Sequence, residues 1–161
     1  MYETIEVANY LLELSYKDKI PVNPMKLLKL VYIAHGWYMV FYDGPLINER
    51  VECGEFGPNI RSVYHKVKSY GNDPIPQKIK YKTDGFDKRA KRSLVGATDL
   101  LDTVWLRYKD LTAIQLSNMC HKEGSPWKIV WDYGGSTIRG TNIPNELIEQ
   151  HYKNLVDESK T

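Results

Sequence analysis

Apolar residues recur at three- and four-residue steps in the first segment of the chain, and polar residues fall between them. The apolar set is Ile5, Ala8, Leu11, Leu12 and Tyr16, and the polar set is Glu6, Asn9 and Glu13. This spacing predicts an amphipathic helix that lies on a core. Pro21 ends the helical stretch, because proline disfavours helical geometry in the residue before it.

The following segment, residues 24–42, is apolar on most of its circumference. Asn23 can cap a helix start, and Pro24 suits the first helical position. A helix of this kind belongs in the middle of a fold. Its charges, Lys26 and Lys29, lie in the first two turns, where the helix dipole disfavours cations. These lysines either lie solvated at the helix end or bind an acidic group outside the domain.

Residues 45–58 are short and punctuated by glycine and proline, which predicts a small strand or hairpin. Pro58 is expected to open a helix that ends at Gly71. From residue 77 to 96 the pattern changes, since Ile79 and Tyr81 alternate with Lys78, Lys80 and Lys82, and a basic run with Lys88 and Arg89 follows. This segment predicts an edge strand and an exposed basic loop.

Three further helix starts are indicated by capping residues. Thr98 precedes an apolar pattern, Thr112 and Gln115 form a capping-box pair, and Ser125 is followed by Pro126. Pro144 begins a last helix with one apolar face, formed by Leu147, Ile148, His151, Tyr152 and Leu155. The chain is therefore expected to be one domain, residues 1–161, mainly α with a small β element (α+β). We expect a compact helical domain around the buried helix at 24–42, with a short antiparallel hairpin or small sheet.

Composition and charge narrow the functional classes. The 161 residues are 42% hydrophobic and 26% charged, which is typical of a globular domain. A net charge of +2 does not provide the basic surface of a dedicated nucleic-acid binder. The N-terminus has no basic leader, and no apolar run reaches the ~20 residues that span a bilayer. We expect a cytoplasmic chain without a membrane partner.

A search for catalytic and metal-binding patterns finds little. No glycine-rich phosphate loop occurs, and no two histidines are paired at metal-ligand spacing. Cys53 and Cys120 are too far apart for a CxxC site and are expected to be reduced thiols. His35 is expected to be a hydrogen-bonded core histidine. We predict no cofactor and no enzyme activity, and a hydrolase using His121, Ser125 and Glu123 is the less favoured alternative.

Three blocks then carry a resemblance: PMKLLKLVYIAHGWY at 24–38, GPL at 44–46 with EFGP at 55–58 and SVY at 62–64, and LSNMCHKEGSPW at 116–127. In this order they resemble the Panacea domain of SocA-like antitoxins and phage-associated proteins. Cys120 stands where such proteins often carry threonine, and residues 77–96 correspond to a variable region. The motif residues, expected to hold the fold together, are Pro24, Leu27, Leu30, Tyr32, His35, Gly36, Trp37, Tyr38, Gly57, Pro58, Tyr64, His121, Gly124, Ser125, Pro126 and Trp127.

The resemblance implies an antitoxin that neutralises a cognate toxin protein, encoded next to it, by direct binding. It also implies that members close to SocA act as adaptors that deliver the toxin to a Clp-type protease. A phage-associated regulatory or DNA-binding role is the alternative, although nucleic acid is not the expected partner. The residues that we expect to contact a partner are Lys26, Lys29, Tyr64, Lys78, Lys80, Lys82, Lys88 and Arg89.

Overall fold

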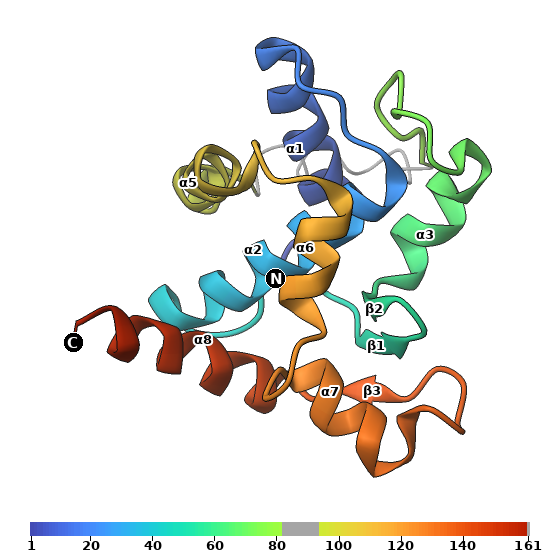
Figure 1. The fold of residues 1–161 in the computed structure, drawn as a ribbon. Coiled ribbons are helices and arrows are strands. Elements are labelled where there is room, and N and C mark those ends of the chain that lie inside the picture. Colours follow the sequence, from blue (N-terminus) through green and yellow to red (C-terminus); the bar gives the residue numbers. More distant parts are fainter. Residues whose placement is uncertain (82–93, 161) are drawn as a thin grey trace.

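The computed structural model describes residues 1–81 and 94–160, and it places one helix at the centre of the fold (Figure 1). This helix, α2 (Pro24–Phe41), contacts helices α1 (Thr4–Asp18), α3 (Arg61–Val67), α5 (Thr98–Tyr108), α6 (Ala113–Cys120) and α8 (Asn145–Ser159). Every residue from Lys26 to Met39 is buried. The prediction of a central buried helix is confirmed, as is the mainly α class with a small β element.

The start of α2 follows from its sequence. The side chain of Asn23 accepts a hydrogen bond from the backbone N–H of Lys26, and Pro24 occupies the first turn. Both features satisfy or remove amide donors that a helix start leaves without partners. The helix then runs through the core, where its residues from Lys26 to Met39 are buried on all sides, and it reaches the surface at Phe41.

A small antiparallel sheet packs against this helical core. Strands β1 (Val51–Gly54) and β2 (Gly57–Asn59) form the expected hairpin, with Gly54 opposite Gly57. A third strand, β3 (Asn142–Ile143), pairs with β1 on its other side, so that the strand order is β2-β1-β3. The sequence did not indicate β3, since two residues are too short to show a periodic pattern.

The predicted helix start at Pro58 is wrong. Pro58 belongs to β2, and α3 begins at Arg61. After α3 the chain forms a 3-10 turn, η1 (Lys68–Tyr70). This helical stretch ends at Gly71, whose φ of 59° lies in the left-handed region. The predicted helix end at Gly71 is therefore close to the observed one.

The predicted edge strand does not form within residues 77–81, which belong to no strand. The side chain of Asn9 in α1 takes the place of a neighbouring strand: it accepts from the N–H of Ile79 at 2.7 Å and donates to the carbonyl of Ile79 at 2.9 Å. An amide side chain has the same donor and acceptor as a peptide unit, so it can satisfy one extended residue. The rest of the predicted basic loop, residues 82–93, lies outside the described part of the chain.

The helix caps of the second half follow the sequence in two cases of three. Thr112 and Gln115 form the capping box of α6, and Ser125 caps α7 (Pro126–Val130) by accepting from the N–H of Lys128. Thr98 caps nothing: it lies inside α5, which follows a 3-10 turn, η3 (Leu94–Gly96). Beyond α7, a π-helical segment, η4 (Trp131–Gly135), leads to β3 and α8.

Candidate functional site

The three sequence blocks meet around the β1–β2 hairpin. From α2, the ammonium group of Lys29 donates a hydrogen bond to the carbonyl of Pro58 at 2.9 Å. Gly57 lies directly beside this lysine; its φ is +112°, and a Cβ there would stand 3.1 Å from Lys29 Nζ. The close approach of the lysine and the positive φ both favour glycine at this position.

The third block holds the other side of the hairpin. Ser117 Oγ donates to the carbonyl of Phe56 at 3.0 Å, and the indole N–H of Trp127 donates to the carbonyl of Gly54 at 2.6 Å. His121 lies between these anchors, with Nδ1 at 3.3 Å from Ser117 Oγ and its ring against the ring of Trp127. The motif residues therefore form a clamp that binds the hairpin to α2, α6 and α7.

Burial corrects the expectation that Lys26 and Lys29 reach outward. Their exposed fractions are 6% and 3%. Lys26 Nζ donates to the carbonyl of Lys109 at 2.5 Å, and Lys29 is bound to Pro58 as described. Burial lowers the pKa of both groups, that of Lys29 to about 8. Lysines usually keep the ammonium group in water, but here both side chains turn into the fold and donate to backbone carbonyls.

The geometry does not support the alternative of a hydrolase using His121 and Ser125. Ser125 is 1% exposed, and its hydroxyl oxygen accepts the N–H of Lys128 as a helix cap. The ring of His121 is paired with Ser117 instead. The side chain of Glu123 is exposed and lies 3.8 Å from the ammonium group of Lys128. The three groups thus have separate structural partners.

Most motif residues lie inside the molecule. His35 is fully buried, and its Nε2 pairs with Asn145 Oδ1 at 2.9 Å, so the prediction of a hydrogen-bonded core histidine is confirmed. The buried set comprises Pro24, Leu27, Leu30, Tyr32, His35, Gly36, Trp37, Tyr38, Gly57, Pro58, Ser125, Pro126 and Trp127. His121 is half-buried, whereas Gly124 and Tyr64 are exposed.

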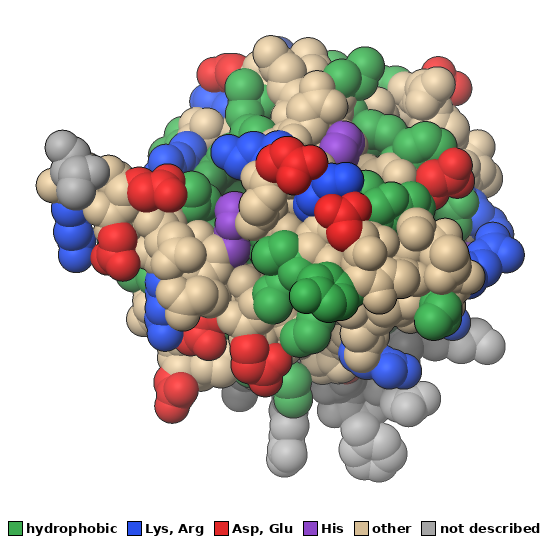
Figure 2. Space-filling model, turned by 60° about the horizontal axis from the view of Figure 1, so that its bottom comes forward, with side chains coloured by type: hydrophobic (Ala, Val, Ile, Leu, Met, Phe, Trp, Pro, Cys, Tyr) green, Lys and Arg blue, Asp and Glu red, His purple; other side chains and the backbone are tan. Residues whose placement is uncertain are grey.

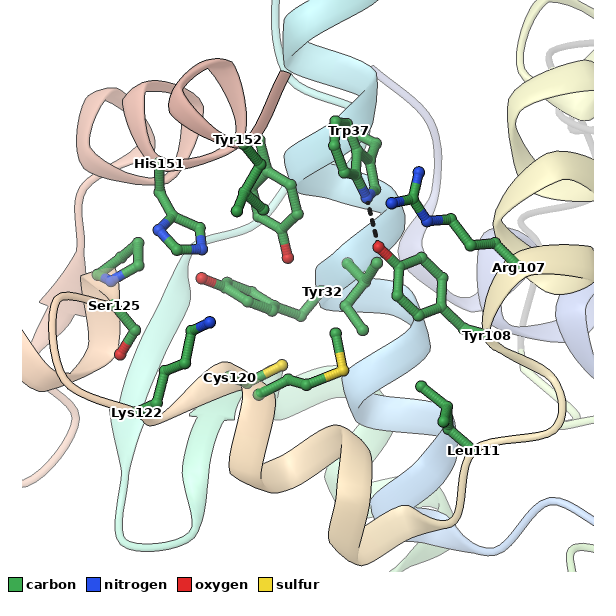
Figure 3. Close-up of a pocket in the computed structure, with 14 residues that line it drawn as sticks. Tyr32, Trp37, Arg107, Tyr108, Leu111, Cys120, Lys122, Ser125, His151 and Tyr152 are labelled. Atoms are coloured by element: carbon green, nitrogen blue, oxygen red, sulfur yellow. Dashed lines mark hydrogen bonds between the residues drawn. The ribbon is translucent and has the colours of Figure 1, made fainter. Parts of the chain in front are cut away.

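A pocket of about 360 Å³ opens beside the clamp, between α2, α5, α6 and α8 (Figure 3). Its inner wall is aromatic, formed by Tyr32, Trp37, Tyr108 and Tyr152. The indole N–H of Trp37 donates to the hydroxyl of Tyr108 at 2.9 Å, which fixes these two rings relative to each other. The polar groups of the lining are Arg107, Cys120, Lys122, Ser125 and His151.

Tyr32 is the exceptional residue of this pocket. Its hydroxyl is buried and has no hydrogen-bond partner. Burial raises the pKa of this phenol well above its usual value, so it stays protonated and remains a donor. Buried hydroxyls nearly always have partners, and one without a partner needs an explanation. The sequence pattern placed Tyr32 and Tyr152 on helix faces, but it could not show that two distant helices enclose a pocket.

The remaining candidate residues lie on the surface. Tyr64 is 42% exposed, and Lys78 and Lys80 are exposed, with Lys78 forming a 3.3 Å ion pair with Glu13. Lys82, Lys88 and Arg89 lie outside the described residues. The face in Figure 2 shows acidic and basic side chains interspersed, with hydrophobic ones exposed between them, and no continuous basic area.

The cysteines, the search for a metal site and the lengths of the helices add three findings. Cys53 and Cys120 are buried free thiols, and burial raises their pKa values to about 11 and about 12. Within residues 1–81 and 94–160, no group of three or more His, Cys, Asp or Glu side chains is placed to hold a metal ion. None of the described helices is long and apolar enough to cross a membrane.

Comparison with known proteins decides the family. A family model described as "Antitoxin SocA-like, Panacea domain" matches residues 27–128, which include the hairpin, the clamp and most of α2. The chain belongs to this family. The Antitoxin SocA of Caulobacter vibrioides (strain NA1000 / CB15N) is 26% identical over an alignment 161 residues long. The alignment covers 91% of this chain and 80% of that protein. No solved structure matches.

Family membership changes how the pocket is understood. The SocA-like match ends at residue 128, whereas α8 lies beyond it and supplies His151, Tyr152 and Leu155 to the pocket wall. One side of the pocket, with Tyr32, Trp37, Cys120, Ser125 and Pro126, therefore comes from the Panacea blocks. Only the α8 residues of the lining come from outside the matched range, since Arg107, Tyr108 and Leu111 lie within it.

Proposed function

We propose that this chain is the antitoxin of a toxin–antitoxin pair, and that it neutralises its toxin in the cytoplasm by binding it directly. The observation that carries this proposal is the SocA-like family match over residues 27–128, supported by the similarity to Antitoxin SocA. The burial and capping role of Ser125 supports a binding function over the hydrolase alternative. The toxin is a protein, encoded next to this chain.

The contact surface that we propose lies outside the motif clamp. The clamp residues hold the hairpin to the helices, and a scaffold of that kind can be shared by antitoxins with different toxins. Tyr64, Lys78 and Lys80 are exposed and remain proposed contact residues. Lys82, Lys88 and Arg89 are proposed on their sequence alone. Tyrosine and arginine are common energetic anchors of protein interfaces, and the lysines are proposed for their charge.

A finer proposal concerns how binding neutralises the toxin. An antitoxin either covers the functional surface of its toxin or delivers the bound toxin to a Clp-type protease. The resemblance to members close to SocA favours delivery for this chain. Direct binding is common to both modes, so it is the step to test first.

Co-expression with the protein encoded by the adjacent reading frame tests the proposal. We expect that the neighbour alone stops growth and that growth returns when this chain is produced with it. A neighbour that is harmless alone, or that remains toxic beside this chain, would contradict the proposed pairing. Pull-down of the tagged chain with the neighbour then checks that rescue coincides with a complex.

The two modes differ in the fate of the toxin. Delivery predicts that toxin abundance falls when this chain is present and that deleting the Clp protease restores both abundance and toxicity. Direct inhibition predicts constant toxin abundance and rescue that does not need the protease. Immunoblots of the toxin in both strains distinguish these outcomes.

A further inference from the structure

The pocket between α2, α5, α6 and α8 carries positive groups without acidic ones. The cations Arg107 and Lys122 line it together with the imidazole of His151, and no Asp or Glu is among the lining residues that the structure describes. Arg107 stacks its guanidinium over the rings of Trp37 and Tyr108, so this cation is held at the pocket wall. The charge of the lining therefore favours an anion.

The lowered pKa of His151 is a second sign of the positive charge in this pocket. Its pKa is lowered first by burial and then by the nearby ammonium of Lys122, and only Glu158, further along α8, acts in the other direction. The imidazole is therefore mainly neutral near pH 7, when it can still donate one N–H. An anion placed between Lys122 and His151 would offset the effect of the ammonium group on the imidazole and would be attracted by both groups.

The unpartnered hydroxyl of Tyr32 supplies a second, independent observation. Tyr32 is 1% exposed, and its hydroxyl lacks a partner. Figure 3 shows this hydroxyl on the same side of the pocket as the imidazole of His151 and the side chain of Lys122. A buried donor without an acceptor is costly, and an acceptor that enters the pocket would remove that cost.

We propose that this pocket receives the side-chain carboxylate of an acidic residue on the toxin, an inference that rests on the proposed function. The carboxylate accepts a hydrogen bond from Tyr32, forms an ion pair with Lys122, and accepts a further hydrogen bond from His151. Lys122 is exposed, and its flexible side chain moves aside to admit the anion. The methylene groups of the entering residue lie against Trp37 and Leu155.

The side-chain carboxylate is favoured over two other anions. A folded protein displays many Asp and Glu side chains on its surface but a single terminal carboxylate. Phosphate would present a larger charge, for which the lining offers one ammonium, one neutral imidazole and one hydroxyl beside the ring-stacked guanidinium of Arg107. The half-aromatic wall instead suits a small anion carried on an aliphatic stem.

Capped peptides test the chemistry of the pocket without the toxin. The full chain, with tyrosines labelled at Cζ, is titrated by NMR with acetyl-Leu-Glu-Leu-amide at concentrations up to ~10 mM. We expect a saturable shift of the Tyr32 signal, and roughly tenfold weaker binding of the isosteric Leu-Gln-Leu peptide because a charged acceptor is replaced by a neutral one. Equal binding of both peptides, or no saturable shift, would overturn the proposal. So would tighter binding of a tripeptide with a free C-terminus or of inorganic phosphate.

Variants separate recognition from folding. Tyr32→Phe removes a hydroxyl that has no partner, so the melting temperature should not fall, while binding of the Glu peptide weakens roughly tenfold. Lys122→Ala should also weaken binding, whereas Lys153→Ala should not, because Lys153 pairs with Glu149 away from the pocket. Full binding by Tyr32→Phe would contradict the proposal.

Toxin neutralisation by the same variants distinguishes this inference from the proposed function. If the wild-type chain rescues growth and Tyr32→Phe with Lys122→Ala rescues equally well, the antitoxin function stands and the pocket inference fails. If the wild-type chain does not rescue growth, the proposed function fails, and the peptide titration alone shows whether the pocket binds carboxylates.

Discussion

At the scale of single residues, Gly36 shows why a residue without a side chain belongs in a buried helix. A Cβ at this position would overlap the ring of Tyr152, a residue of α8 whose side chain packs directly against α2 here. Glycine normally weakens a helix by about 1 kcal/mol relative to alanine. The close packing of α8 on α2 is the compensation, and the sequence alone could not reveal it because the two residues are far apart in the chain.

We predict that Gly36→Ala destabilises the chain, against the helix propensity of the two residues. Overpacking of a core typically costs about 1 to 3 kcal/mol and the better helix propensity of alanine returns about 1 kcal/mol, so a net loss of up to about 2 kcal/mol is expected. Urea denaturation measures it. The control is Tyr152→Ala combined with Gly36→Ala: the double variant should lose less than the two single losses together, because the smaller residue makes room. Strict additivity would contradict this packing argument.

Lys29 provides a residue-scale prediction for pH. Burial lowers its pKa in the folded chain from 10.5 to about 8, so between these values the unfolded chain binds a proton that the folded chain does not. The contribution of this residue to the free energy of unfolding therefore rises as the pH increases from about 8 to about 10.5. Relative to a Lys29→Met variant, the wild-type chain should gain about 3 kcal/mol across this window.

Comparison with Lys29→Met is the measurement that isolates this effect. The raised pKa values of Cys53 and Cys120 have the opposite consequence: they remove stability as the pH rises above about 9, where unfolded thiols ionise. The contribution of Cys53 is the same in both proteins and cancels in the difference between unfolding free energies. The charge of Lys29 lowers the pKa of Cys120, so the difference is read below about pH 9, where this thiol is protonated in both states. A difference that does not change with pH would show that folding does not lower the pKa of Lys29.

At the scale of elements, caps were predictable where the side-chain acceptor has a second signal beside it. Asn23–Pro24 and Ser125–Pro126 start helices with a following proline, and Thr112 does so with the capping-box partner Gln115. Thr98 has neither signal, and the chain already turns through η3 before it. The strand prediction at 77–81 failed for a different reason, because alternation reports which side chains face inward and not what pairs with the backbone. Here Asn9 supplies that pairing.

Ser125 allows a test that separates a cap from a catalytic hydroxyl. Ser125→Ala should cost about 1 kcal/mol of stability, whereas Ser125→Gly should cost only a few tenths, because glycine is tolerated as a helix cap. Both variants should still neutralise the toxin in the growth assay. Loss of neutralisation in Ser125→Gly with an unchanged melting temperature would favour the hydrolase alternative.

The clamp on the hairpin makes a second prediction for elements. Trp127→Phe keeps an aromatic ring but removes the N–H that bonds the carbonyl of Gly54. We expect a loss of about 1 to 2 kcal/mol, since a partly buried carbonyl is left without this donor. Amide exchange, followed by mass spectrometry, should accelerate in β1 and β2 more than in α1. Uniform acceleration would indicate that the bond does not act locally.

At the scale of the whole molecule, the fold class followed from the hydrophobic pattern because one helix, α2, is apolar on most sides and must be surrounded. The order of its neighbours and the pocket did not follow. The pocket wall combines Tyr32, Tyr108, Cys120 and Tyr152 from four helices, and their meeting depends on packing angles that helical periodicity does not encode. The family resemblance located the motif blocks, but α8 lies beyond the matched range.

Because α8 is joined to α2 through buried contacts, we predict that the described helices unfold as one cooperative unit. Unfolding followed by circular dichroism and by tryptophan fluorescence should give the same midpoint. Asn145→Ala removes the partner of His35 Nε2 in an imidazole whose Nδ1 already lacks one, so it should cost about 1 to 3 kcal/mol. The matched control is Asn154→Ala, an exposed residue of the same helix, which should change stability by less than ~0.5 kcal/mol. Two separate transitions, with α8 lost before the core, would mean that the pocket opens independently and that its shape in the free chain is not the shape a toxin meets.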